Sequence, residues 1–254
     1  MQSSFFTTNH KSILKSFLVA AVFTASASNA VFAHNVSEKK DSPTNSTHIS
    51  ILLDRSGSMD SIREDTIGGF NQFLDDQRDN STDATLSFVQ FDSSDSYEVI
   101  YDFQDLAGVS DLDRNDFVPR GGTPLLDAIG RSINDLEADL DALSEDERPE
   151  KVVMAIITDG RENSSFEFTK TEIESMIDEK QDEDDWQFVF LSSDLSAIGE
   201  AQILGFQPFG VLKYENTSEG VSSGWSNLSN SFSEYSSNSE QSVMRFDRPH
   251  VHAE

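Results

Sequence analysis

Five side chains with hard oxygen donors follow apolar runs or precede a helical pattern in three separated parts of the sequence. Asp54, Ser56 and Ser58 come directly after one apolar run, in the segment DRSGS. Thr123 stands in a GGTP segment, and Asp159 follows the most hydrophobic run of the chain. Two carboxylates and three hydroxyls suit Mg²⁺ or another hard cation that keeps several waters, and they suit zinc or copper poorly. The pattern predicts a divalent cation site, provided that the fold brings the three segments together.

Each of these residues also has an ordinary structural explanation. Ser56 or Ser58 could cap a following helix, and Thr123 before a proline is a good N-cap and first-turn pair. Asp159 before a glycine could form a simple turn. For any single residue the structural explanation is the better one. The presence of all five at the ends of the right elements favours a shared site.

The elements that must position these residues alternate between strand and helix. Apolar runs predict strands at 49–53, 84–91, 97–103, 152–157, 187–191 and 209–214. Apolar residues at intervals of three and four predict helices at 62–77, 126–143, around 173–177, at 195–204 and at 217–237. The short gap between the second and third strands predicts a hairpin with an antiparallel edge strand. The predicted fold class is α/β, a doubly wound, mostly parallel sheet with helices on both faces. In such sheets ligands bind beyond the carboxyl ends of the strands, where the five residues stand.

The chain of 254 residues is long enough for one such domain with short extensions. We assign residues 47–237 to the domain and 238–254 to a C-terminal tail. Residues 1–33 have the features of a secretory signal peptide: basic Lys11 and Lys15, an apolar run, and a small-x-Ala site that ends at Ala33. Residues 34–46 are polar and predict a flexible leader. An uncleaved membrane anchor is the alternative for the N-terminal segment.

Composition excludes several classes of function. The sequence has no cysteine, so disulfides, zinc-thiolate sites, cysteine nucleophiles and a lipid-modified cysteine are absent. The formal net charge of -28 repels nucleic acid and anionic membranes, so we expect neither nucleic acid binding nor membrane insertion after signal cleavage. The acidic field could gather cations. A solvated acidic face that aids solubility is the simpler interpretation of the charge.

Two other metal patterns are weaker. Asp111, Asp113 and Asn115 begin like a calcium-binding EF-hand loop, but Asp116 and Gly122 stand where Gly and Glu are required. We reject an EF-hand and keep a looser calcium site as an alternative. His250, His252 and Glu254 could bind a transition metal, although histidines on a terminal tail are more often solvated.

Catalytic patterns are missing or unspecific. A Ser-His-Asp triad needs a histidine near the nucleophile, and the predicted domain contains only His48, at the opposite end of its strand from Asp54. The sequence has no phosphate-binding loop and no dinucleotide fingerprint. Acidic pairs for glycoside hydrolysis cannot be judged by counting, because 46 acidic residues make chance pairs inevitable. We therefore expect no enzymatic activity.

The cation pattern resembles a known site. Asp54-x-Ser56-x-Ser58, with Thr123 in its GGTP segment and Asp159 in ITDG, is similar to the metal-ion-dependent adhesion site of von Willebrand factor A (VWA) domains. The resemblance covers roughly residues 47–237 and agrees with the order of the elements. It implies that Asp54, Ser56, Ser58 and Thr123 ligate the metal directly or through water, with Asp159 acting through water. It also implies an open coordination position for a carboxylate of a protein partner.

Three functions follow as hypotheses. The first is an exported metal-dependent protein-binding module of the adhesion type, with Mg²⁺ or another hard divalent cation such as Mn²⁺ or Ca²⁺. The second is a metal-dependent hydrolase, because a cation with an open position can activate water. The third is a structural exported protein whose metal only stabilises the fold. The signal peptide predicts a periplasmic or extracellular location, and the short single-domain layout favours a bacterial source.

Overall fold

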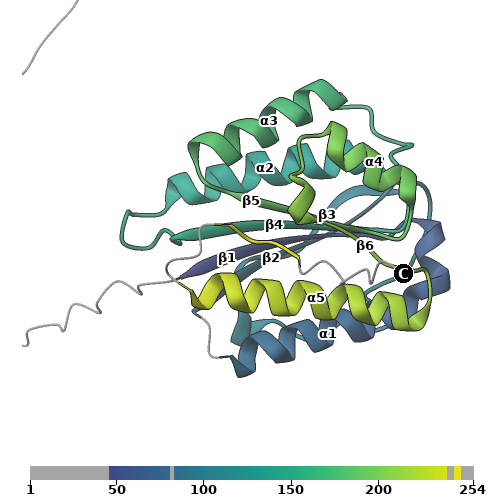
Figure 1. The fold of residues 1–254 in the computed structure, drawn as a ribbon, viewed down its shortest axis with the longest axis horizontal. Coiled ribbons are helices and arrows are strands. Elements are labelled where there is room, and N and C mark those ends of the chain that lie inside the picture. Colours follow the sequence, from purple (N-terminus) through teal and green to yellow (C-terminus); the bar gives the residue numbers. More distant parts are fainter. Residues whose placement is uncertain (1–45, 81–82, 239–242, 247–254) are drawn as a thin grey trace, which may run out of the picture. The chain divides into compact units, whose positions relative to one another are not determined.

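The computed structural model describes residues 46–80, 83–238 and 243–246, and these form a single six-stranded sheet covered by helices (Figure 1). The sheet order is β3-β2-β1-β4-β5-β6. Its strands are β1 (Thr47–Asp54), β2 (Ala84–Asp92), β3 (Asp95–Asp105), β4 (Lys151–Thr158), β5 (Gln187–Ser192) and β6 (Val211–Lys213). All neighbouring pairs are parallel except β2 and β3, which are antiparallel at one edge. The predicted fold class and edge strand are confirmed.

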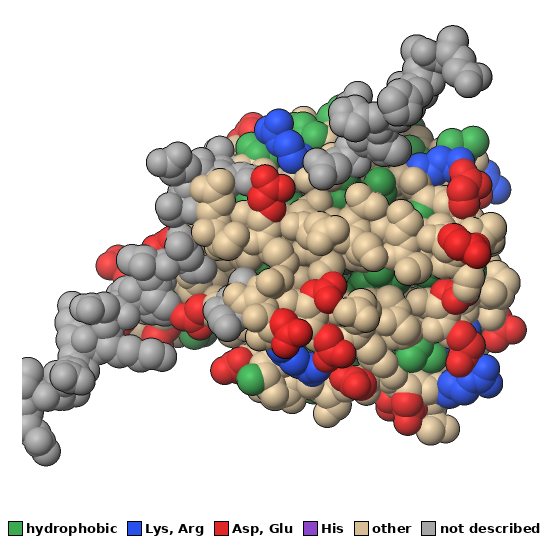
Figure 2. All heavy atoms as spheres, turned by 60° about the horizontal axis from the view of Figure 1, so that its bottom comes forward, with side chains coloured by type: hydrophobic (Ala, Val, Ile, Leu, Met, Phe, Trp, Pro, Cys, Tyr) green, Lys and Arg blue, Asp and Glu red, His purple; other side chains and the backbone are tan. Residues whose placement is uncertain are grey.

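Five α-helices cover the two faces of the sheet (Figure 1). On one face lie α1 (Arg63–Asp79) and α5 (Ser218–Ser237); on the other lie α2 (Leu125–Ala142), α3 (Lys170–Glu183) and α4 (Leu195–Ile203). Short 3₁₀ turns occur at Gly57–Ile62, Leu106–Gly108 and Pro208–Gly210. The predicted serine-rich helix at 217–237 is α5. Figure 2 shows the face that carries α1 and α5, where acidic side chains are scattered among neutral polar ones.

Alternation along β1 divides the core into two layers. Ile49, Ile51 and Leu53 pack with α1 and α5, whereas Leu52 packs with the α2 side. This period of two is the geometry of a strand, and it places the side chain of Ser50 on the α2 side as well. Both layers are apolar, which explains why β1 and β4 have nearly continuous hydrophobic sequences.

A short part of the predicted C-terminal tail packs in the core. Residues 243–246 were assigned to a tail, but Met244 and Phe246 are buried in the core layer of α1 and α5. The backbone N–H of Phe246 also donates to the carbonyl of Phe209 across 2.9 Å. A segment this short has no periodic pattern that could reveal burial. The tail residues 239–242 and 247–254, the signal peptide and nearly all of the leader lie outside the described residues.

Among the residues that the structure describes, no helix has the length and apolar character needed to cross a membrane.

Candidate metal centre

The site begins where β1 and β4 end side by side. The two strands are paired in parallel as far as Leu53 and Ile157, so the next residues, Asp54 and Thr158, are neighbours at the carboxyl edge. The Thr158 hydroxyl donates to Oδ2 of Asp54 across 2.6 Å, and the backbone N–H of Ser56 donates to Oδ1 across 2.6 Å. Both oxygens of the Asp54 carboxylate are therefore oriented by the protein.

A short chain of hydrogen bonds links the DRSGS segment to the end of β4. The Ser58 hydroxyl donates to Oδ1 of Asp159 across 2.6 Å, and the hydroxyls of Ser56 and Ser58 lie 3.2 Å apart. Ser56 is buried, whereas Ser58 is exposed, so the group opens toward solvent at Ser58.

Thr123 reaches the same place from the segment before α2. A Cβ atom added to Gly160 would lie 3.5 Å from Oγ1 of Thr123 and 3.6 Å from Oγ of Ser58, so both hydroxyls face Gly160. Asn163 fixes Thr123 from both sides: its Oδ1 accepts from the Thr123 N–H at 2.8 Å, and its own N–H donates to the Thr123 carbonyl at 3.1 Å. The structure thus brings together all five residues of the predicted site, and their role as ligands stays a prediction.

The structure does not support a helix-capping role for the hydroxyls of Ser56 and Thr123. Ser56 precedes the 3₁₀ turn at Gly57–Ile62, but its side chain makes no capping hydrogen bond. Helix α2 begins at Leu125, after Thr123 and Pro124. Its first N–H groups donate to side chains of the loop after β4, Leu126 to Glu162 at 3.0 Å and Asp127 to Ser165 at 3.1 Å. The Thr123 hydroxyl is consequently not used as a cap.

The carboxylates of the site lack a positive partner. The side chain of Asp54 is fully buried, and this burial raises its pKa to about 7, against hydrogen bonds from Thr158 and Ser56 that lower it. Burial also raises the pKa of Asp159. In the described part of the chain, neither carboxylate belongs to an ion pair. A buried carboxylate without a counter-charge is costly, so a divalent cation would supply what the protein side chains do not.

The donor set fits a hard cation. The site offers two carboxylates and three neutral hydroxyls, all of them oxygen ligands. Among residues 46–80, 83–238 and 243–246, no group of three or more His, Cys, Asp or Glu side chains forms a metal cluster. A cation here would depend on the hydroxyls of Ser56, Ser58 and Thr123, which leave most of its charge unneutralised.

Arg55 stands within the DRSGS segment, yet its guanidinium points away from the site. Its Nε donates to Asp92 at 2.8 Å, and its Nη1 donates to Glu98 and Gln90. The Nε of Arg120 donates to the same Asp92 at 3.0 Å. Burial opposes ionisation of Asp92, but hydrogen bonds from Ser94 and from Arg55 hold its pKa below the ordinary value. The guanidinium of Arg55, the positive group nearest in sequence to Asp54, therefore makes its hydrogen bonds away from the site.

The same network joins the two loops that carry the hydroxyls. The backbone N–H of Arg120 donates to the Arg55 carbonyl at 2.8 Å, and that of Gly57 donates to the Gly121 carbonyl at 3.1 Å. Gly121 has a φ of +67°, and a Cβ there would lie 2.5 Å from the Ser93 hydroxyl. Glycine is required at this position by both conformation and space.

Several solved structures are similar to this chain in fold. No protein-family model matches the chain, and no curated protein matches it. The pilus adhesin SpaC from Lactobacillus rhamnosus GG is 13% identical, with a TM-score of 0.56, over 75% of this chain and 30% of that one. Proximal thread matrix protein 1 from the mussel byssus, with a zinc-occupied MIDAS motif, is 16% identical with a TM-score of 0.51, over 74% of this chain and 46% of that one. A von Willebrand factor type A structure from Catenulispora acidiphila is 14% identical with a TM-score of 0.49, over 74% of this chain and 42% of that one.

The chain has the von Willebrand factor A fold. It spans less than half the length of each of these three structures. At these identities the likeness shows the VWA fold alone, so the cation and the partner are treated below as proposals.

Within the VWA fold, the candidate ligands are held in place by residues that the sequence pattern did not predict. Thr158 orients Asp54, and Asn163 fixes Thr123. The carboxylate of Glu162 accepts a hydrogen bond from the Leu126 N–H at the start of α2. A visible signal was the uninterrupted polar run after Asp159 in RENSS, which is longer than a simple turn needs. Their partners lie far away in sequence, so the spacing could not predict which groups they bind.

The weaker metal patterns gain no support. The Asp113 carboxylate accepts hydrogen bonds from the backbone N–H groups of Asn115 and Asp116, at 2.5 Å and 3.1 Å. It therefore stabilises the conformation of its own loop. These bonds lower the pKa of Asp113. The pair His250 and His252 lies outside the described residues.

Proposed function

We propose that this chain is an exported, metal-dependent protein-binding module of the adhesion type. A divalent cation would bind at Asp54, Ser56, Ser58, Thr123 and Asp159, and its open position would accept a carboxylate from a protein partner. The observation that carries the proposal is the buried Asp54 carboxyl, which has no positively charged partner and lies at the sheet edge where hydrogen bonds link Ser56, Ser58 and Asp159.

The neutral hydroxyls explain why such a cation would recognise an acidic group. Hydroxyl ligands carry no charge, so the ion keeps much of its positive charge toward solvent. At physiological ionic strength the Debye length is about 8 Å, so repulsion of an acidic partner by the acidic surface is largely screened beyond that distance. A carboxylate that reaches the ion can therefore bind despite the net charge of -28.

The surroundings of the site support docking of a protein. Phe166, in the loop after β4, is 78% exposed, and Leu195, in the first turn after β5, is 69% exposed. Both segments follow the carboxyl ends of strands, on the edge where the cation would bind. Exposed large apolar side chains beside a charged anchor are common features of protein interfaces.

Export and the adhesion role are part of the same proposal. The sequence pattern of residues 1–33 is that of a secretory signal peptide, and the similarity to a pilus adhesin is compatible with a surface or periplasmic role. The donor chemistry favours Mg²⁺, while the MIDAS motif of the mussel protein is described as occupied by zinc.

We propose recognition rather than catalysis. The histidine that lies in the described residues, His48, is buried in the second position of β1. At about 3.3 Å per residue it stands about 20 Å from Asp54, too far to act as its general base.

A chelator-reversible capture experiment tests the proposal. Immobilised wild-type protein, an Asp54→Asn variant and a Glu174→Gln control are exposed to envelope extract in Mg²⁺, and bound proteins are eluted with EDTA. Glu174 is exposed on α3, so its substitution removes one charge away from the site. We expect the wild type and the control to release the same partner into EDTA, and Asp54→Asn to release none. Recovery that is equal from all three proteins, or unaffected by chelator, would contradict the proposal.

A further inference from the structure

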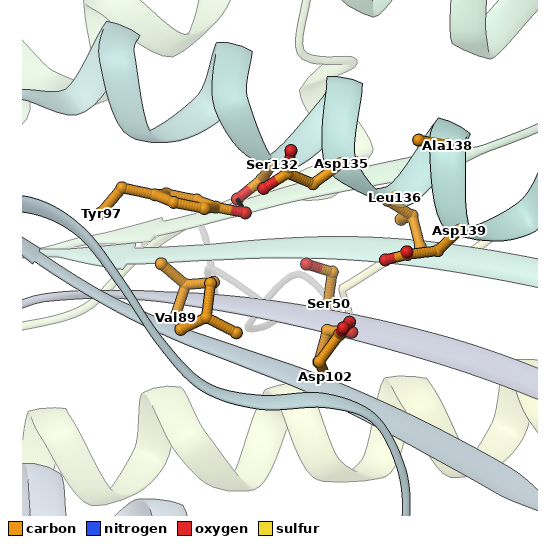
Figure 3. A pocket seen from close by; sticks show the side chains of 11 residues that line it. Ser50, Val89, Tyr97, Asp102, Ser132, Asp135, Leu136, Ala138 and Asp139 are labelled. Atoms are coloured by element: carbon orange, nitrogen blue, oxygen red, sulfur yellow. Dashed lines mark hydrogen bonds between the residues drawn. The ribbon is translucent and has the colours of Figure 1, made fainter.

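A cleft lies between α2 and the part of the sheet formed by β1, β2 and β3. Its volume is about 160 Å³. Figure 3 shows side chains from the helix and from the strands pointing into it from opposite sides. The polar members of its lining are Ser50, Ser87, Tyr97, Asp102, Ser132, Asp135 and Asp139.

Two local features of the sequence build this cleft. Helix α2 presents Ser132, Asp135 and Asp139 at intervals of three and four, which places them along one stripe. The pairing of β2 with β3 shifts register between Val89–Val99 and Phe88–Tyr101, so β3 holds one extra residue there. Such a bulge turns the following side chains to the other face, and it lets Asp102 line the same cleft as Val99.

The cleft carries concentrated negative charge. Three carboxylates line it, and the described lining contains no Lys or Arg. Within the described part of the chain, Asp102, Asp135 and Asp139 take part in no ion pair, whereas Glu137 and Asp141 of the same helix α2 do. Burial raises the pKa of Asp139, and the nearby carboxyl groups of Asp102 and Asp135 raise it further. These groups repel each other, which a cation between them would relieve.

A buried hydroxyl provides an independent sign of a ligand. Ser50 is only 2% exposed, and Figure 3 shows its oxygen directed into the cleft. No hydrogen bond joins this hydroxyl to another described residue, whereas Ser87 accepts from the Phe103 N–H at 3.0 Å and Ser132 donates to Tyr97 at 3.4 Å. The oxygen of this nearly buried side chain is therefore free to bind a group that enters the cleft.

The walls indicate the class of cation. A bare metal ion needs ligands that converge at one point, and no such acidic cluster is found among the described residues. Here the acids lie on both sides of a cleft whose other walls are Val89, Val99, Leu136 and the ring of Tyr97. An alkylammonium group matches this arrangement, because it has three donors on an apolar stem and is attracted to an aromatic face.

We propose that the α2–β3 cleft binds a primary alkylammonium group, with the ammonium between Asp102, Asp139 and Ser50 and the alkyl stem against Tyr97 and Val89. The group could belong to a free amine or to a lysine side chain of another protein. The chemistry is the same in both cases. This site is separate from the candidate metal centre and does not depend on it.

Titration of the full chain with n-butylammonium, followed by ¹H–¹⁵N NMR in EDTA at physiological ionic strength, tests the proposal. We expect saturable shifts confined to residues of the cleft, and no such shifts with n-butanol. An Asp102→Asn/Asp139→Asn double variant should weaken binding by about tenfold or more, because two charge-assisted hydrogen bonds are lost. Removing like charges that repel each other should leave the fold intact.

The control variant carries the same change of charge. Asp141 and Asp146 are exposed and lie outside the cleft, so Asp141→Asn/Asp146→Asn should alter the affinity by less than about twofold. Equal weakening in both double variants would show a diffuse surface effect and overturn the proposal. Equal shifts with n-butanol, or Ca²⁺ binding at these residues without competition from n-butylammonium, would also overturn it. Parallel titrations with 1,4-diaminobutane and a lysine-containing peptide distinguish a free amine from a protein side chain.

Discussion

The Thr158 hydroxyl donates a hydrogen bond of 2.6 Å to Oδ2 of Asp54, and the two residues end neighbouring parallel strands of the sheet. The backbone of β1 and β4 therefore fixes the direction of the carboxylate before any ligand arrives. Groups that orient a metal ligand in this way commonly contribute one to two orders of magnitude to metal affinity.

Replacing Thr158 with Val should weaken binding of Mg²⁺ by about tenfold or more, since Asp54 loses the donor that orients it. Thr66→Val is the matched control, because the Thr66 hydroxyl is buried without a hydrogen-bond partner in the described residues. Its removal should leave the affinity unchanged. Calorimetric titration of both variants with Mg²⁺ checks the prediction, and equal affinities in the two variants would count against a role for Thr158.

Arg55 should be essential to stability because it joins two loops from a buried position. Arg55→Met leaves the buried Asp92 with only Arg120 as an ionic partner, and we expect a loss of about 3 kcal/mol in the free energy of unfolding. The same substitution at Arg114, whose side chain is 67% exposed and paired with Glu64, should cost less than about 1 kcal/mol. Urea unfolding of the two variants measures the difference. Similar losses of unfolding free energy in both would contradict the stabilising role of Arg55.

The packing of α1 against α5 depends on one glycine of an adjacent pair. A Cβ on Gly69 would lie 2.1 Å from the Trp225 ring, whereas a Cβ on Gly68 would meet nothing within 4 Å. Gly69→Ala should therefore destabilise the protein by about 1–3 kcal/mol. Gly68→Ala should stabilise it by about 0.5–1 kcal/mol, because alanine favours the helix. Thermal unfolding of both variants provides the test. The prediction is wrong if the two substitutions shift the melting temperature in the same direction.

His48 should make the fold sensitive to acid. Burial lowers its pKa from 6.5 to about 3, so the folded protein keeps the ring neutral while the unfolded chain takes up a proton below about pH 6.5. Between these values the unfolded state binds more protons, and stability therefore falls as the pH decreases, by up to about 1.4 kcal/mol per pH unit. From pH 7 to pH 5, the unfolding free energy of the wild type should fall more than that of His48→Gln. A constant difference would exclude this contribution.

The sequence was sufficient for the fold and for the set of candidate ligands because both depend on local patterns. Continuous apolar runs identified β1 and β4, and the residues after each run had to reach the same edge. The serine-rich α5 was recognisable by the spacing of Val221, Trp225 and Leu228.

Contacts between distant residues were not accessible in the same way. The partners of Arg55 and Asn163 depend on loop conformations that no spacing rule describes. The cleft near Ser50 depends on a bulge in β3, which breaks the alternation that sequence patterns assume. Met244 and Phe246 were missed because burial of a short segment depends on the surface that it meets.

We propose that Asp54, Ser56, Ser58, Thr123 and Asp159 together bind a divalent cation. Isothermal titration with Mg²⁺ at physiological ionic strength, of wild type, Asp54→Asn and the Glu174→Gln control, provides the decisive test. We expect saturable binding of one ion in the wild type and the control, and its loss in Asp54→Asn. Equal binding by all three proteins would rule out this site, because the ion would then be held by the general acidic surface.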